Sequence, residues 1–185
     1  MRAVLDACVI YPTVLREILT GVAAQGLYQP FWSDRILREW VLATQKLGPG
    51  AMTQAEAEAA LLKSAFPRAM VRAQPDIEAR VLLPDGNDRH VLAVAIAAHA
   101  DCIVTFNARD FPRHVLAEDG IERRDPDSLL WELWSHHAEA VTAVVMAVHA
   151  TAERMAGQAL PLKALLKRAQ LPKLVKAILG ANTAG

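Results

Sequence analysis

Five polar side chains, four carboxylates and one amide, lie after predicted strands or on predicted helices. They are Asp6, Glu39, Asp88, Asn107 and Asp110. Taken singly, each acid is more commonly a helix cap or a solvated surface charge. Gathered at one end of a sheet, such acids would repel one another unless a cation lies between them or their pKa values shift. Oxygen ligands suit Mg²⁺ or Mn²⁺ and not zinc, and a metal held in this way activates water and stabilises charge on a phosphate.

One stretch of the chain, residues 84–112, supplies three of these five side chains. Residues 84–87 have turn chemistry, and Asp88 then opens a helix that is apolar nearly all round and is therefore expected to be buried. The continuous apolar run at 102–104 is typical of a strand inside a parallel sheet. Such a strand delivers Asn107 and Asp110 to the carboxyl edge of the sheet, where open α/β folds place their sites.

The remaining predicted elements alternate strands with helices. In order they are a strand at 2–5, a helix from Pro12, an extended segment at 29–32, a helix capped by Ser33 or Asp34 that carries Glu39, a helix opened by a Thr53–Glu56 capping box, and a short strand at 120–124. Asp125-Pro126 predicts a helix start, and one long helix is expected from about Asp127 towards Gly157. Two short amphipathic helices follow. The alternation predicts an α/β fold with a central, mostly parallel sheet and a helical C-terminal extension.

Composition and charge limit the possible partners. The 185 residues are 53% hydrophobic, yet no apolar run reaches the roughly 20 residues of a membrane helix, so no membrane association is expected. Cys8 and Cys102 read as buried thiols of a reducing, cytoplasmic compartment. All 20 acids and 14 of the 20 basic residues lie in 1–153, a formal charge of −6, whereas the chain from Arg154 onward holds six cations and no acid. This basic tail is expected either to bind an anionic partner or to pack on the acidic body.

Two other kinds of chemistry find little support in the sequence. A phosphatase of the haloacid-dehalogenase type would need a second Asp two residues after Asp6, and Cys8 occupies that place. Neither a G-x-G-x-x-G nor a Walker loop is present. His90 is in a position to touch a phosphate, although an exposed place on the helix surface is the commoner situation for such a histidine.

The chain resembles the PIN-domain family of metal-dependent ribonucleases. The matching features are Val4-Leu5-Asp6, Glu39, Asp88 followed by Val91-Leu92-Ala93-Val94-Ala95, Ile103-Val104-Thr105-Phe106-Asn107, Asp110-Phe111-Pro112, and the stretch from Gly120-Ile121 to Asp125-Pro126-Asp127-Ser128-Leu129-Leu130. The resemblance implies an α/β/α sandwich over residues 1–134, with residues 135–185 as a helical extension outside the shared pattern. It also implies cleavage of RNA phosphodiester bonds with Mg²⁺ or Mn²⁺. Many bacterial members are VapC-like toxins that a cognate antitoxin neutralises, and they often form homodimers.

The resemblance also implies roles for individual residues. Asp6, Glu39 and Asp88 would be metal ligands. Many members carry Asp at the fourth position, where this chain has Asn107, a neutral oxygen ligand, and Asp110 would substitute for the missing charge. An alternative stays open, namely a PIN-fold module that binds RNA or protein without catalysis; the complete set of acids argues against it.

Overall fold

The computed structural model describes residues 1–181, which form two compact units. The first consists of Met1–Tyr11 and Tyr28–Arg124, and the second of Pro12–Leu27 together with Asp125 and the chain beyond it. The boundary expected near residue 134 remains a prediction, because a division into compact units does not define where a family domain ends.

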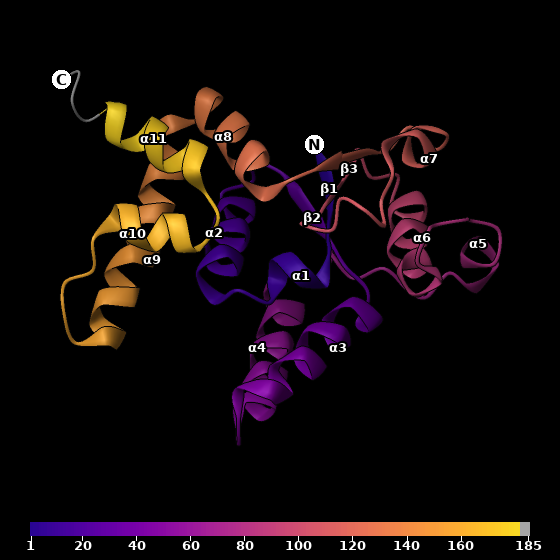
Figure 1. Cartoon of the computed structure of the whole chain (residues 1–185), viewed down its shortest axis with the longest axis horizontal. Coiled ribbons are helices and arrows are strands. Elements are labelled where there is room, and N and C mark those ends of the chain that lie inside the picture. The colour runs from indigo at the N-terminus through magenta and orange to yellow at the C-terminus, as the bar shows by residue number, and fades with distance from the viewer. Residues whose placement is uncertain (182–185) are drawn as a thin grey trace. The chain divides into compact units, whose positions relative to one another are not determined.

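A four-stranded sheet organises the first unit (Figure 1). Its strands are β1 (Arg2–Leu5), β2 (Gln29–Phe31), β3 (Cys102–Val104) and β4 (Glu122–Arg124), in the order β2-β1-β3-β4. Every neighbouring pair is parallel. The predicted α/β class, with a central parallel sheet, flanking helices and a helical C-terminal part, is confirmed.

The carboxyl edge of this sheet continues beyond the strands through backbone hydrogen bonds. The Asp6 amide donates to the Val104 carbonyl at 3.1 Å, and the Thr105 amide donates to the Arg124 carbonyl at 3.0 Å. Because β1 and β3 are parallel neighbours in the centre of the sheet, the segments that follow these two strands leave the sheet at adjacent points. The first predicted acid and the loop after β3 are therefore held side by side at this edge.

Helices of the first unit complete the scaffold. They are α1 (Ala7–Ile10), α3 (Asp34–Ala43), η1 (Thr44–Leu47), α4 (Ala51–Ala65), α5 (Pro75–Glu78), η2 (Gly86–Asp88), α6 (Arg89–Ala97) and α7 (Arg113–Ala117). Ser33 caps α3 by accepting the Ile36 amide at 3.3 Å, as expected. The predicted capping box of α4 is wrong: that helix begins after Gly50, whose φ of 84° suits glycine, and Thr53 lies inside it. Residues 90–95 of α6 are buried, which confirms the expectation for this helix.

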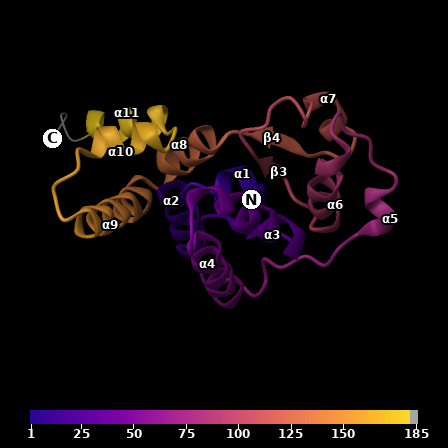
Figure 2. The ribbon, with the colours of Figure 1, turned by 60° about the horizontal axis from the view of Figure 1, so that its bottom comes forward.

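The second unit is entirely helical over its described residues (Figure 2). It comprises α2 (Thr13–Ala24), α8 (Pro126–His136), α9 (Ala138–Ala156), α10 (Leu162–Arg168) and α11 (Pro172–Ala181). Asp125 caps α8 by accepting the Ser128 amide at 2.9 Å. The single long helix expected from Asp127 to Gly157 is wrong, because the backbone breaks at His137, with φ −138° and ψ 51°. Among residues 1–181, no helix combines the length and apolarity needed to cross a bilayer.

Candidate active site

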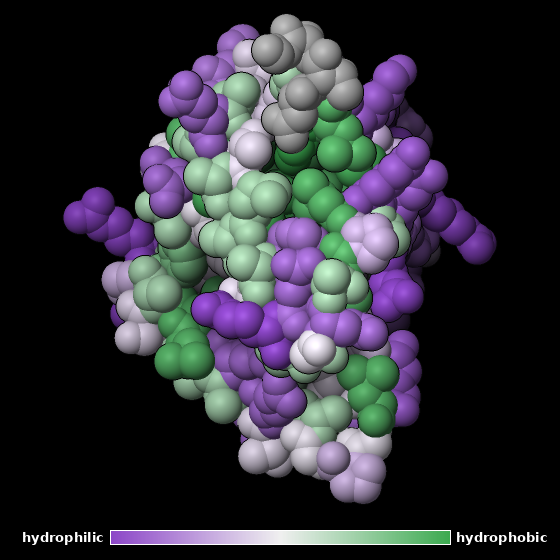
Figure 3. Space-filling model, turned by 90° about the vertical axis from the view of Figure 1, so that its left-hand side faces the viewer, coloured by the Kyte–Doolittle hydropathy of each residue, from purple (hydrophilic) through white to green (hydrophobic). Residues whose placement is uncertain are grey.

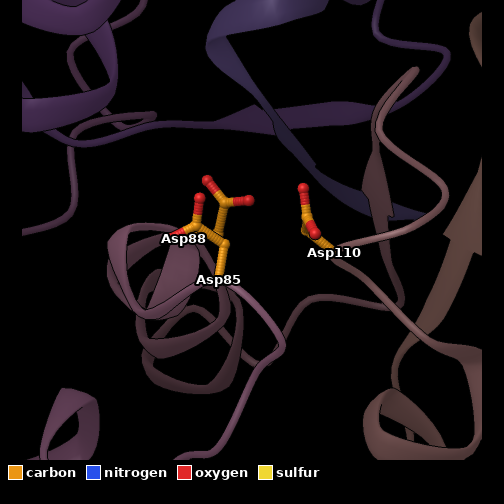
Figure 4. Close-up of side chains that lie close together, drawn as sticks. All are labelled: Asp85, Asp88 and Asp110. Atoms are coloured by element: carbon orange, nitrogen blue, oxygen red, sulfur yellow. The ribbon is translucent and has the colours of Figure 1, made fainter.

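Three carboxylates converge beside the carboxyl edge of the sheet (Figure 4). Asp85, Asp88 and Asp110 each offer one oxygen, and these atoms all lie within 4.8 Å of one another. Asp85 and Asp88 stand together at the two ends of the turn that leads into α6, and Asp110 faces them from the loop after β3. Sequence reasoning named Asp88 and Asp110 but missed Asp85, because a carboxylate in a Pro-Asp-Gly-Asn turn is adequately explained by the turn.

Asp85 does stabilise the turn, as its place in the sequence suggests. One of its oxygens, Oδ1, accepts the Asn87 amide at 2.8 Å and so closes the turn. The same bond fixes the side chain, with the carboxylate directed at the cluster rather than free to rotate. The spacing of three between Asp85 and Asp88 was the available signal, since it brings two acids to one helical turn.

Asn107 connects the two sides of the cluster. Its amide nitrogen donates to Asp88 Oδ2 at 3.2 Å and to Asp110 Oδ2 at 2.8 Å. Its amide oxygen accepts the Asp110 backbone N–H at 3.3 Å. The predicted position of Asn107 among the acids is what the structure has, and there it acts as a hydrogen-bond donor between two carboxylates.

Asp6 is held at the sheet edge by two side-chain donors, a hydroxyl and a thiol. Its Oδ2 atom accepts the Thr105 hydroxyl at 2.6 Å and the Cys8 thiol at 3.0 Å, and only 7% of the residue is exposed. Burial and the charge of Asp6 raise the pKa of the Cys8 thiol to about 12, so this thiol stays a neutral donor. The Phe106 amide in turn donates to the Cys8 sulfur at 3.3 Å. The expectation of a buried thiol is confirmed for Cys102 but wrong for Cys8, which is half-buried because it lies beside Asp6 at the sheet edge and donates to it.

Glu39 reaches the site from α3 and is paired with two cationic or basic groups. Its Oε1 atom lies 2.9 Å from His90 Nε2 and 3.3 Å from Arg35 Nε. His90 is only 5% exposed, so its expected place on a helix surface is wrong. The physical reason is that α6 is buried over residues 90–95, so the imidazole faces the interior beside Glu39 instead of solvent.

Arg35 joins three segments of the first unit. Besides Glu39, its guanidinium donates to Glu78 Oε1 of α5 at 2.8 Å and to the Asn87 carbonyl at 3.0 Å. The Asn87 carbonyl belongs to the turn that carries Asp85 and Asp88. One side chain therefore ties the helix that bears Glu39 to the turn that bears two of the clustered acids.

Burial and the neighbouring acids raise the pKa of Asp88. Its pKa is raised from 3.8 to about 6, first by burial and then by the charges of Asp6, Asp85, Asp110 and Glu39, in that order. All the predicted acids therefore act on one carboxylate, and Asp85 acts with them. Such mutual repulsion favours a cation, and the clustered ligands are carboxylate oxygens with no Cys or His among them. This donor set fits a hard divalent ion such as Mg²⁺ or Mn²⁺.

Comparison with known proteins agrees with this chemistry. Residues 2–109 match the family described as PIN domain. A protein of Mycobacterium tuberculosis (strain ATCC 25618 / H37Rv), described as "Putative ribonuclease VapC50", is 39% identical over 59 residues. That match covers 32% of this chain and 35% of the relative, so the chain spans about a third of the length of the curated protein it matches. No solved structure matches the chain.

Proposed function

The chain belongs to the PIN-domain family, and from this premise we propose that it is a Mg²⁺- or Mn²⁺-dependent ribonuclease that hydrolyses RNA phosphodiester bonds. The observation that carries the proposal is the convergence of Asp85, Asp88 and Asp110, with ligand atoms within 4.8 Å, at the sheet edge where Asp6 also ends its strand. The proposal extends to a role as the toxin of a bacterial toxin–antitoxin pair, acting in the cytoplasm on RNA as a homodimer and neutralised by a cognate antitoxin protein.

Asp88 and Asp110 would hold the metal from opposite sides, with Asp85, Asp6 and Glu39 completing the negative charge around it. A divalent ion in this place supplies activation of a water molecule and stabilisation of the charge on the phosphate. The proposal includes the side-chain oxygen of Asn107 as a metal ligand. The side-chain nitrogen of Asn107 donates to two carboxylates, and this supports a further role in which Asn107 holds them at a fixed separation.

The surrounding donors fix the acids before any substrate arrives. Thr105 and Cys8 orient Asp6 through one oxygen and leave the other available. His90 and Arg35 both approach Glu39 through the single atom Oε1. Such preorganisation matters because misplaced ligands lose much of their effect on a transition state.

The test of the nuclease proposal compares substitutions of equal chemistry inside and outside the cluster. Purified wild type should cleave RNA with Mg²⁺ or Mn²⁺ and lose cleavage in EDTA. Asp88→Asn and Asp6→Asn should each reduce the rate at least about 100-fold, since each removes charge from the metal site. Asp76→Asn, which neutralises an exposed acid of the same unit, should leave the rate unchanged.

Three results would contradict the proposal. Cleavage that persists in EDTA would exclude the metal mechanism. Asp88→Asn with wild-type activity would exclude the cluster. Wild type that binds RNA but cleaves none with either metal would favour the alternative of an inactive RNA-binding module.

A further inference from the structure

A basic surface lies on the last two helices of the described chain. We name as the α10–α11 surface the exposed side chains Lys163, Lys167, Arg168, Lys173 and Lys176. From Arg154 to the end, the sequence contains no acidic residue. Figure 3 looks onto the side of the molecule where these helices lie and shows hydrophilic side chains projecting next to apolar ones.

The apolar faces of the same helices are already used. Leu166 of α10 and Leu174, Val175 and Ile178 of α11 are buried. Asp127 of α8 accepts the amides of Lys173 and Leu174 at 2.8 and 3.0 Å, which caps the start of α11 and fixes its position on α8. The apolar faces of α10 and α11 are therefore buried within the second unit, and the cations remain exposed.

The cations of these two helices affect helix stability in both directions. Lys167 and Arg168 lie in the last turn of α10, where the helix dipole favours a cation. Lys163 and Lys173 lie in the first turns of α10 and α11, where the helix dipole disfavours a cation by about 0.3–1 kcal/mol. Lys163 and Lys167 form a like-charged pair at i,i+4, which costs a few tenths of a kcal/mol. Lys173 donates a hydrogen bond to the Ser128 hydroxyl at 2.6 Å. Within residues 1–181, the other four cations form no ion pair with an acid.

Lys163 and Lys173 carry a local cost at their helix starts, and such a cost is typical of residues kept for a function. Five closely placed cations, four of them lysines, suit a chain of phosphates, because a lysine contacts phosphate as a mobile point charge. The remaining chain, residues 1–153, has a formal charge of −6 and repels nucleic acid on average. A nuclease with such a body needs cations elsewhere to attract its substrate.

We propose that the α10–α11 surface binds the phosphate backbone of RNA. This inference rests on the proposed ribonuclease function, since that function makes RNA the polyanion the protein meets. The contacts are to phosphates, so affinity should depend strongly on salt and little on sequence.

The experiment measures the salt dependence of RNA binding by the full chain. Binding of a fluorescein-labelled single-stranded RNA is followed by anisotropy in EDTA, over a series of salt concentrations. The test variant combines Lys163→Gln, Lys167→Gln, Arg168→Gln and Lys176→Gln and keeps Lys173, which contacts α8. Each phosphate contact contributes about 0.7 to the slope of log affinity against log salt, so the slope should fall by up to about 3, with at least about tenfold weaker binding at low salt.

A control of matched charge separates a local surface from a general charge effect. It combines Lys46→Gln, Arg68→Gln, Arg72→Gln and Arg80→Gln, four exposed cations of the first unit. The control should keep a slope near that of the wild type. The test variant should unfold near the wild-type temperature, because it loses both the repulsion between Lys163 and Lys167 and the favourable dipole interactions of Lys167 and Arg168. Thermal unfolding of both variants checks that weaker binding does not come from misfolding.

Several outcomes would overturn the inference. They are an unchanged slope in the test variant, an equal loss in the control, and a loss of binding to anionic phospholipid vesicles while the RNA slope stays the same. The nuclease proposal fails separately. Wild type that cleaves no RNA but shows the difference in slope refutes only the nuclease, and an active wild type with no difference in slope refutes only the surface.

Discussion

Replacing Arg35 with glutamine separates the effect of charge from the effect of position in the proposed metal site. Arg35 is 46% exposed and touches Glu39, Glu78 and the Asn87 carbonyl at 3.3, 2.8 and 3.0 Å. Glutamine removes the positive charge and cannot span three acceptors. If charge alone mattered, loss of a nearby cation would tighten metal binding, by about 0.5–1 kcal/mol for one exposed unit charge.

The structure predicts the opposite sign. Without the guanidinium, the turn that carries Asp85 and Asp88 loses its tie to α3, and Glu39 keeps only His90 as a partner. Loss of a group that orients metal ligands typically weakens metal binding 10–100-fold, about 1.4–2.7 kcal/mol. Since this exceeds the charge effect, Arg35→Gln should bind Mn²⁺ about tenfold more weakly than wild type, despite its more negative site.

The assay is calorimetric titration of Mn²⁺ into protein stripped with EDTA, with amide hydrogen exchange over residues 85–90 as a second measurement. Exchange there should accelerate in Arg35→Gln. Arg35→Lys keeps the charge but lacks the planar fork, so it should resemble Arg35→Gln rather than wild type. Arg38→Gln removes the same charge from an exposed position on α3 and should leave the affinity unchanged or slightly tighter. Tighter Mn²⁺ binding by Arg35→Gln would refute the positioning role.

Two further predictions concern stability in the absence of metal. The rise in the pKa of Asp88 from 3.8 to about 6 means that its ionised form opposes folding; the full shift corresponds to about 3 kcal/mol, which solvent screening of this partly exposed group reduces to about 1. Asp88→Asn should therefore stabilise the protein in urea unfolding at pH 8, and the gain should vanish near pH 4; destabilisation at pH 8 would contradict this sign. Asp125 behaves in the opposite way: burial would raise its pKa, but the bonds from Ser128 and the charge of Lys173 outweigh burial and lower it. Asp125→Ala should cost about 1–2 kcal/mol at pH 7, and this difference should shrink as the pH falls through the lowered pKa; an equal difference at low pH would exclude the ionic contribution.

The two central strands, β1 and β3, were predictable because each contains a short continuous apolar run. The outer strands β2 (Gln-Pro-Phe) and β4 (Glu-Arg-Arg) carry no such signal. Parallel pairing places the carboxyl ends of these strands at one edge of the sheet. The backbone hydrogen bonds of Asp6 and Thr105 at that edge agree with this placement. The helix boundaries were less predictable. The break at His137 has no Pro or Gly in the sequence beside it, so no local residue signal predicts where α8 ends. At α4 the Thr53–Glu56 pattern competed with a glycine at positive φ, and the glycine determined the start.

The sequence named the candidate acids of the site, which stay a prediction, but not the groups that hold them in the structure. Asp6, Glu39, Asp88 and Asp110 were named from their order along the chain, and their joint action on the pKa of Asp88 agrees with a shared site. The partners of these acids come from distant segments, as with Glu39 and His90, and no local spacing reveals such a pair. The burial of His90 did have a signal, since a helix that is apolar nearly all round leaves little surface for an imidazole.

The neutral amide of Asn107 gives the candidate site its particular charge distribution. A carboxylate at position 107 would face Asp88 and Asp110 with a third negative charge, whereas the Asn107 amide donates to both and draws them together. Around the neutral Asn107, the negative charge is carried by Asp110 of the same loop and by Asp85 and Asp88 in the turn before α6. Affinity for a cation must then depend on how firmly that turn is held. Because Arg35 binds the turn through the Asn87 carbonyl, we expect this exposed arginine to support the geometry of the proposed metal ligands.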